Sequence, residues 1–137
     1  MKVGELMTGG NLITARPGTP VLDARQTMLK ERIRHLLVTE EGGLLLGIVT
    51  DRDIRLNLPS QATSLSMWEV NYLLAKLTVD KVMTRSVIIT GPDQDAHDAA
   101  RLLLEHKIGA LPVLDGEHLI GIVTETDILR AFARSQH

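Results

Sequence analysis

The sequence predicts an α/β (α+β) fold in which two β-α-β-β-α units pack into one module by pseudo-two-fold symmetry. The first observation is a duplicated octamer, because GIVTDRDI at 47–54 returns as GIVTETDI at 121–128. The second is that other motifs recur around it in the same order, for example VGELMT at 3–8 and VDKVMT at 79–84. Such a repeat indicates duplicated structural units, and a unit of this size is too small to cover both faces of its own sheet.

The repeat divides the chain into three segments. The first copy covers residues 1–56, a connector covers 57–78, and the second copy covers 79–137. The offset between the copies falls from 76 residues at the start to 74 at the octamer, so small deletions are expected in the loops.

Each copy opens with a short β-rich run, Leu12–Thr14 or Val87–Thr90, and a proline-containing loop then leads into a helix. In the first copy Thr19 is the expected N-cap, and Pro20 suits the first helical position. In the second copy the spacing of the apolar residues predicts a core-facing helix whose stripe is Ala96, Ala99, Ala100, Leu103 and Leu104.

A hairpin and a second helix complete each copy. The predicted strands are His35–Thr39 and Leu44–Val49 in the first copy, and Ala110–Leu114 and Leu119–Val123 in the second. Glycine-containing turns at 41–43 and 115–116 join them. The second helix is expected to begin after Thr50 in one copy and after Thr124 in the other.

The connector is expected to be an ordered helix that packs on the module. Residues Asn57–Leu65 have the composition of a loop, and Ser66 with Glu69 then matches a capping box. The apolar residues that follow share one helix face, formed by Met67, Val70, Leu74 and Leu77.

Charge and composition argue against nucleic-acid and membrane binding. The chain has 15 Lys+Arg and 17 Asp+Glu residues, without the basic stripe that a duplex binder needs. Trp68, Tyr72 and Phe132 are its only aromatic residues, too few for stacking along a single strand. No apolar run reaches the length of a membrane span, and the N-terminus lacks a signal-peptide core. We expect a soluble cytoplasmic protein that binds neither nucleic acid nor membrane.

Motifs for catalysis and metal binding are missing from the sequence. There is no cysteine, and the five histidines do not have the spacing of metal ligands. Neither a phosphate-binding G-x-x-x-x-G-K-[ST] loop nor a G-x-S-x-G elbow is present. We therefore expect a protein that is not an enzyme and has no metal and no resident cofactor.

The end of each octamer has two compatible interpretations. Thr50 with Asp53, and Thr124 with Asp127, match a capping box, and the glycine that opens each octamer can relieve crowding at a strand bend. A helix N-terminus also suits a phosphate, and a nearby carboxylate can accept hydrogen bonds from the hydroxyls of a ribose. A ribonucleotide site and a purely structural cap both remain open.

Taken together, these motifs resemble a pair of CBS domains, which is called a Bateman module. The resemblance rests on M-T near the start of each copy, I-T before a proline, and G-h-V-T-x-x-D at the end, and it covers essentially the whole chain. The stretch SMWEVNYLLAKLTVDKVMT further resembles CBS proteins of the acetoin-utilisation regulator type. Many of those carry a C-terminal ACT domain; the resemblance here ends with the second copy, so we expect the regulator type without the ACT domain.

The resemblance implies a regulatory module that binds AMP, ADP, ATP or S-adenosylmethionine in clefts between the repeats, and a regulated protein partner. It implies that the ribose is held by Asp53 and Asp127, and the phosphate by Thr50 and Thr124. Adenine would lie near Ile13, Thr14, Ile89 and Thr90, and each cleft would be closed by Arg34 with His35, or by Gly109 with Ala110.

The two copies differ in charge. Residues 1–56 hold 8 basic and 7 acidic residues, whereas residues 79–137 hold 6 and 9. Phosphates need cations, so we expect them to lie toward Arg34, His35 and Arg52, and we expect the two sites to differ in affinity. The alternative is an oligomerisation or protein-interaction module whose vestigial pockets stay unoccupied.

The terminal helix predicts a homodimer. Between Glu125 and Arg134 the residues Ile128, Leu129 and Phe132 lie on more than one helix face, which is more apolar surface than a single module needs to bury. The resemblance implies the same, because Bateman modules commonly pair.

Overall fold

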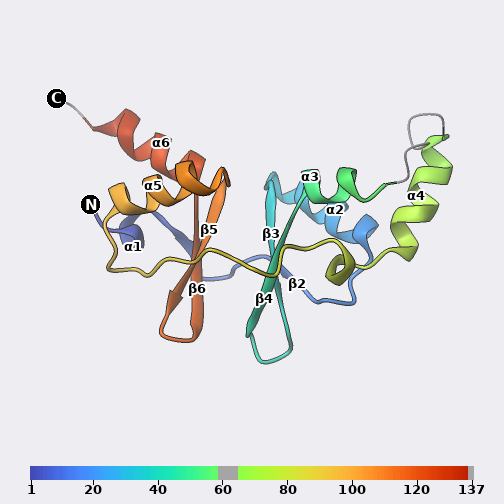
Figure 1. The fold of residues 1–137 in the computed structure, drawn as a ribbon, viewed down its shortest axis with the longest axis horizontal. Helices are drawn as coiled ribbons and strands as arrows, with labels where there is room; N and C mark the ends of the chain where they lie inside the picture. The colour runs from blue at the N-terminus through green and yellow to red at the C-terminus, as the bar shows by residue number, and fades with distance from the viewer. Residues whose placement is uncertain (59–64, 136–137) are drawn as a thin grey trace. The chain divides into compact units, whose positions relative to one another are not determined.

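The computed structural model describes residues 1–58 and 65–135, and its chain forms two compact units (Figure 1). The continuous unit consists of Ile13–Ser86. The discontinuous unit consists of Met1–Leu12 together with Val87–His137. Each unit contains one three-stranded sheet with helices, which confirms the predicted mixed α/β class.

In the continuous unit the sheet has the order β2-β3-β4, with β2 parallel and β4 antiparallel to β3. Its elements are β2 (Thr14–Ala15), α2 (Val21–Glu31), β3 (His35–Thr39), β4 (Leu45–Thr50), α3 (Asp51–Leu56), α4 (Met67–Lys76) and the short 3₁₀ helix η2 (Val79–Lys81). The predicted hairpin is therefore present, and β3 has its predicted bounds.

In the discontinuous unit the sheet has the order β1-β6-β5, and both pairings are antiparallel. Its elements are α1 (Val3–Leu6), β1 (Thr8–Gly9), α5 (Ala96–His106), β5 (Ala110–Asp115), β6 (His118–Thr124) and α6 (Glu125–Arg134). Among the described residues, no helix combines the length and the apolar composition needed to cross a membrane.

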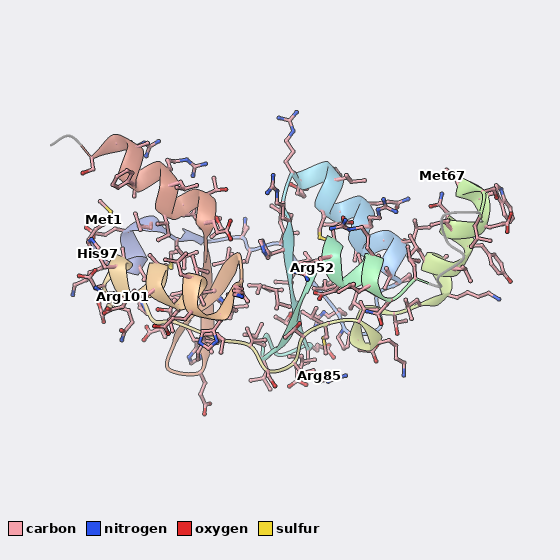
Figure 2. The ribbon with its side chains drawn as sticks, turned by 45° about the horizontal axis from the view of Figure 1, so that its top comes forward. Met1, Arg52, Met67, Arg85, His97 and Arg101 are labelled. Carbon is pink, nitrogen blue, oxygen red and sulfur yellow. The ribbon has the colours of Figure 1, made fainter. Side chains whose placement is uncertain are left out.

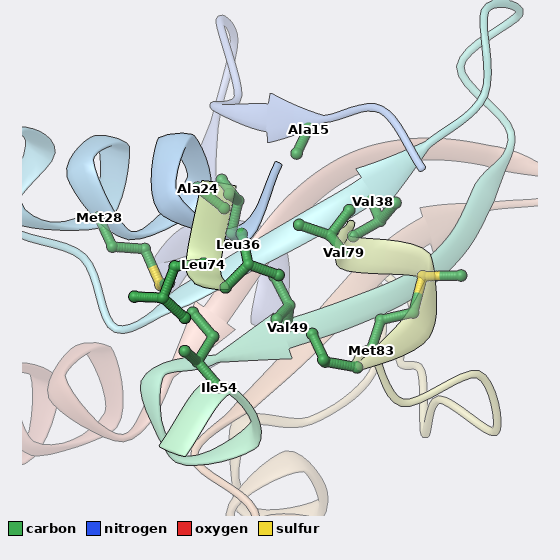
Figure 3. Close-up of a cluster of buried hydrophobic side chains, with 12 residues drawn as sticks. Ala15, Ala24, Met28, Leu36, Val38, Val49, Ile54, Leu74, Val79 and Met83 are labelled. Carbon is green, nitrogen blue, oxygen red and sulfur yellow. The ribbon is translucent and has the colours of Figure 1, made fainter. Parts of the chain in front are cut away.

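The core of the continuous unit joins the connector to the first copy (Figure 3). Leu36, Val38 and Val49 from the sheet pack with side chains of α2 and α3 and with Leu74 of α4. Leu74 is fully buried, and burying one such side chain contributes about 1.5–3 kcal/mol. The connector helix is thus packed on the module, as predicted.

The start of the connector helix also agrees with the prediction, except at one residue. Ser66 is the N-cap, and its Oγ accepts a hydrogen bond from the Glu69 N–H at 3.2 Å. Val70 and Leu77 pack against the core beside Leu74, but Met67 is exposed and is not part of the buried face. It lies in the first turn, one helical turn ahead of the buried positions (Figure 2). Residues 59–64 of the predicted loop lie outside the described residues.

The segments that open the two sequence copies are exchanged between the units. Thr8, from the start of the first copy, pairs through β1 with Ile122 in β6 of the second copy. Thr84, from the start of the second copy, forms the corresponding bridge with Ile48 in β4 of the first. The compact units and the sequence repeats therefore have different boundaries.

The glycine of each octamer lies in close contact with a Met-Thr motif. A Cβ atom at Gly121 would lie 2.6 Å from Sδ of Met7 and 2.8 Å from the carbonyl oxygen of Thr8, so only glycine fits without displacing them. Gly47 has the same relationship with Met83 and Thr84. The expected relief of crowding is thus present in both copies.

Two expected features at the start of the copies are wrong. Residues Val87–Thr90 do not form a strand, because Thr90 alone makes a bridge, to Val113. In the first copy Pro20 is the N-cap rather than the first helical residue, and the hydroxyl of Thr19 accepts from the Arg16 N–H instead of capping the helix. A tertiary contact replaces the cap, since the Val21 N–H donates to the Leu77 carbonyl at 2.7 Å.

The helix α5 buries a narrower stripe than its apolar spacing predicts. Ala99 and Leu103 are buried, whereas Leu104 is exposed, because it lies about 100° further around the helix than Leu103. The N-cap is Asp95, whose Oδ1 accepts from the His97 N–H at 2.8 Å. This hydrogen bond holds the pKa of Asp95 below its usual range.

Candidate functional site

In the continuous unit, the end of the β3–β4 hairpin brings together most of the residues predicted for a nucleotide site. Thr50 ends β4 and is the N-cap of α3. His35 begins β3 and lies directly opposite Thr50 in the strand pairing. Arg34 precedes His35, while Arg52 and Asp53 lie in the first turn of α3.

The predicted residues on the sheet share the face that points away from the core. Successive side chains of a strand point to opposite faces, and Leu36 and Val49 belong to the core cluster. His35 and Thr50 therefore point to the other face. Thr14 pairs with Leu37, two residues along β3 from His35, so Thr14 lies on that face as well. Ile13 precedes Thr14 and is partly exposed, which leaves an apolar surface beside it.

A reciprocal cap links Thr50 and Asp53. The Asp53 N–H donates to Oγ1 of Thr50 at 3.1 Å, and the Thr50 N–H donates to Oδ2 of Asp53 at 2.9 Å. The structural interpretation of the octamer is thus confirmed. It engages one oxygen of the Asp53 carboxylate, and these bonds leave Oδ1 of Asp53 for another donor.

Two exposed cations lie at this hairpin end, because Arg52 is in the first turn of α3 and Arg34 precedes His35, the strand partner of Thr50. Arg34 and Arg52 are both exposed, and neither forms an ion pair within the described part of the chain. Arg52 is labelled in Figure 2. The neighbouring Asp51, in contrast, pairs with Arg55 at 3.2 Å and with Arg25 at 3.9 Å. Arg34 and Arg52 are therefore available for an anion.

The discontinuous unit repeats the arrangement without these cations. Thr124 ends β6, caps α6 and lies opposite Ala110. The Thr124 N–H donates to Oδ2 of Asp127 at 2.8 Å, and the Asp127 N–H donates to Oγ1 of Thr124 at 3.3 Å. Glu125, in the first turn, donates its N–H to the Gly109 carbonyl at 3.0 Å, so Gly109 and Ala110 both lie at this hairpin end.

Asp127 differs from Asp53 because an arginine holds its second oxygen. Nη1 of Arg130 lies 3.5 Å from Oδ1 of Asp127, whose side chain is only 8% exposed. The residue of the first copy that corresponds to Arg130 is Leu56, which also stands three positions after the capping aspartate. Arg130 was not among the predicted site residues, although its spacing of three residues from Asp127 on a predicted helix was a signal for such a pair.

Thr14 and Thr90, which were predicted to play the same role in the two copies, are not equivalent in the two units. Thr14 is exposed on the face away from the core, whereas Thr90 is buried. Thr90 pairs with Val113, a member of the core cluster, and therefore points toward the core. Ile89 is exposed in its place, so the corresponding position in the discontinuous unit offers an apolar side chain instead of a hydroxyl.

The groups at each hairpin end suit the binding of an anion and of hydroxyl groups. Within the described residues, no group of three or more His, Cys, Asp or Glu side chains is placed to hold a metal ion. What each hairpin end offers is backbone N–H groups, a threonine hydroxyl and one carboxylate. Donors at a helix N-terminus suit an anion, and a carboxylate accepts from hydroxyl groups.

Comparison with known proteins shows where this duplicated arrangement is found. The family described as the CBS domain matches residues 3–60 and 79–134, which together make up most of the chain. The chain belongs to the CBS domain family. It is a tandem CBS protein, as the order of its motifs predicted.

Three solved CBS structures are similar over nearly the whole chain. The crystal structure of CBSX2 in complex with AMP has a TM-score of 0.83 at 33% identity, and the match covers 99% of both chains. The CBS domain pair of MJ0100, in complex with 5′-methylthioadenosine and S-adenosyl-L-methionine, has a TM-score of 0.78 at 29% identity, covering 97% of this chain and 96% of that one. The acetoin utilization protein (AcuB) from Vibrio cholerae has a TM-score of 0.80 at 28% identity, covering 97% and 90%.

The first curated relatives are longer than this chain. CBSX2 from Arabidopsis thaliana is 35% identical over 149 residues, and the chain spans 62% of its length. Two other relatives are enzymes, and this chain spans 23% of the length of one and 21% of the length of the other. The similarity to those enzymes thus covers about a fifth of each.

Proposed function

We propose that this tandem CBS protein is a non-catalytic regulatory module that binds an adenosine ligand through the capped hairpin ends of its two units. The observation that carries the proposal is the duplicated Thr–Asp cap at Thr50–Asp53 and Thr124–Asp127. Similar CBS pairs supply the ligand class, since CBSX2 was solved with AMP, and MJ0100 with 5′-methylthioadenosine and S-adenosyl-L-methionine.

The carboxylates are proposed to hold the ribose. An ionised carboxylate accepts hydrogen bonds at both oxygens, and in the continuous unit the cap uses Oδ2 of Asp53. Its Oδ1 can accept from a ribose hydroxyl without breaking the helix cap. The exposed apolar side chains of Ile13 and Ile89 are proposed to contact the adenine ring.

The phosphates are proposed to bind at the continuous unit. The first turn of α3 offers backbone N–H groups and the Thr50 hydroxyl, and Arg34, His35 and Arg52 stand around it. A guanidinium forms strong, charge-assisted hydrogen bonds with phosphate oxygens. In the discontinuous unit Gly109, Ala110 and Thr126 stand at the corresponding positions, so we propose that this unit favours a ligand with less negative charge.

A ligand titration tests this function. The full chain is titrated by calorimetry with AMP, ADP, ATP and S-adenosylmethionine, alongside Asp53→Asn and Asp127→Asn variants. Asparagine keeps the size and most of the capping ability of aspartate while removing its charge. Binding of at least one ligand that is weakened by either substitution supports the proposal. No binding at millimolar concentration contradicts it, and binding that neither variant weakens contradicts the placement of the site.

We also propose that the chain forms a homodimer through α6. Leu129 and Phe132 are 65% and 78% exposed, whereas Ile128 packs on the core of its own unit. Two large apolar side chains on one helix favour association with another copy. If the ligand titrations show no binding, association through these residues favours the alternative function, an oligomerisation or protein-interaction module.

A further inference from the structure

The connector helix α4 carries a line of exposed aromatic and charged side chains on the side opposite its buried face. Trp68 is 77% exposed and Tyr72 is 49% exposed, although tryptophan and tyrosine are usually more buried. Their rings are stacked, with centroids 6.4 Å apart and planes inclined by 11°. Nζ of Lys76 lies 4.4 Å from the centroid of the Tyr72 ring. Within the described residues, no other element covers this line.

The residues on this face are arranged symmetrically about Tyr72. Positions three and four residues away on either side are its neighbours on a helix surface. On the N-terminal side these are Trp68 and Glu69, which both attract a cation, through the ring face and the carboxylate. On the C-terminal side they are Ala75, which is small, and Lys76, which is a cation. All four are exposed.

We propose that this face, formed by Trp68, Glu69, Tyr72, Ala75 and Lys76, binds the same face of a second copy in antiparallel orientation. A two-fold axis at Tyr72 places Lys76 of each copy at the Trp68 and Glu69 end of the other. Each ammonium then meets an aromatic ring and a carboxylate, and Ala75 leaves room for the ring. Such self-complementarity is what an isologous interface requires.

The size of the face sets the strength of this association. A helix of ten residues is about 15 Å long, so the contact buries much less than the roughly 800 Å² per partner of a standard interface. Trp and Tyr are nevertheless the residues that contribute most at interface centres. We therefore expect a weak contact, formed at high micromolar concentration. It is independent of ligand binding and of association through α6.

A charge-swap experiment tests the contact in the full chain. Sedimentation velocity is recorded over a range of concentrations for four proteins, all with Phe132→Ser so that association through α6 does not mask the result. They are the parent, Lys76→Glu, Glu69→Lys, and the double variant with both changes. Trp68 is the only tryptophan, so the shift of its emission with concentration gives a second readout.

The expected result is that the parent associates, that the association constant of each single variant is at least tenfold lower, and that the double variant recovers the association of the parent. Recovery distinguishes pairing between copies from a general effect of charge, because the double variant has the parent's net charge with the two positions exchanged. Circular dichroism confirms that all four proteins remain folded. Equal association of all four proteins, association of none, or failure of the double variant to recover would overturn the proposal.

Discussion

A Cβ atom built on Gly47 would lie 2.6 Å from the carbonyl oxygen of Thr84. This close approach joins two motifs that are far apart in the chain, the start of the first octamer and the Met-Thr that opens the second copy. The Ile48 N–H donates to the same Thr84 carbonyl at 3.0 Å, so the oxygen cannot move away without losing a hydrogen bond. The glycine is therefore required by the docking of the Met-Thr segment.

Replacement of Gly47 by alanine should destabilise the protein. The added methyl group meets the carbonyl oxygen of Thr84 as well as the side chain of Met83. Because the carbonyl is held in place, overpacking of this kind costs about 1–3 kcal/mol. We expect a clear fall in the midpoint of thermal unfolding. The control is Gly42→Ala, where an added Cβ has nothing within 4 Å and should change the free energy of unfolding by about 0.5 kcal/mol or less. Equal stability of the two variants would contradict the close approach.

The residue three positions after each capping aspartate, Arg130 or Leu56, should affect how tightly that aspartate binds AMP. Arg130 pairs with Oδ1 of Asp127, the oxygen that the proposed ribose contact would use, whereas Leu56 forms no such pair with Asp53. With Asp53→Asn present to weaken the other site, Arg130→Leu should tighten AMP binding. The Arg130 side chain is 53% exposed, so solvent screens this ion pair to about 1 kcal/mol or less, and the gain is at most about fivefold.

The reciprocal variant is Leu56→Arg in an Asp127→Asn background, which should weaken AMP binding by a similar factor. Both changes are measured by calorimetry. Weaker binding in the Arg130→Leu protein would show instead that Arg130 contacts the ligand.

Association through α6 should depend on Phe132. Its side chain is 78% exposed in the isolated chain, and replacing it with serine removes an aromatic anchor without emptying the core. We expect the proposed dimer of the wild type to be shifted toward monomer by Phe132→Ser, measured by light scattering at micromolar concentration. The control is Leu44→Ser, an equally polar change at an exposed residue just before β4. A monomeric wild type, or a Phe132→Ser protein with unchanged mass, would contradict this interface.

The sequence predicted most of the local structure because the evidence for it is local. The strand β3 has its predicted bounds, the other hairpin strands differ by at most one residue at each end, and Thr50 and Thr124 cap the helices expected of them. Alternation, turn residues and capping boxes all act within a few residues.

What the sequence did not predict depends on contacts between distant segments. A short segment such as Thr8–Gly9 carries no local sign of which copy it will join, so its pairing with β6 could not be inferred from the repeat. The same holds for Pro20, because a hydrogen bond from Val21 to Leu77 takes the place of a side-chain cap. Arg130 was missed because it stands just beyond the repeated octamer, where the two copies diverge.

The central claim, that Asp53 or Asp127 holds the ribose of an adenosine ligand, is tested most directly by comparing AMP with 2′-deoxy-AMP in calorimetry. Wild type should bind 2′-deoxy-AMP about ten- to hundredfold more weakly, because a hydrogen bond to a charged group contributes about 1.5–3 kcal/mol. In the variant that lacks the carboxylate, Asp53→Asn or Asp127→Asn, the affinity for AMP should fall by a similar factor. The additional loss of affinity for 2′-deoxy-AMP should then largely disappear. A penalty for 2′-deoxy-AMP that remains undiminished in both variants would contradict the claim, because the hydroxyl would then be held by another group.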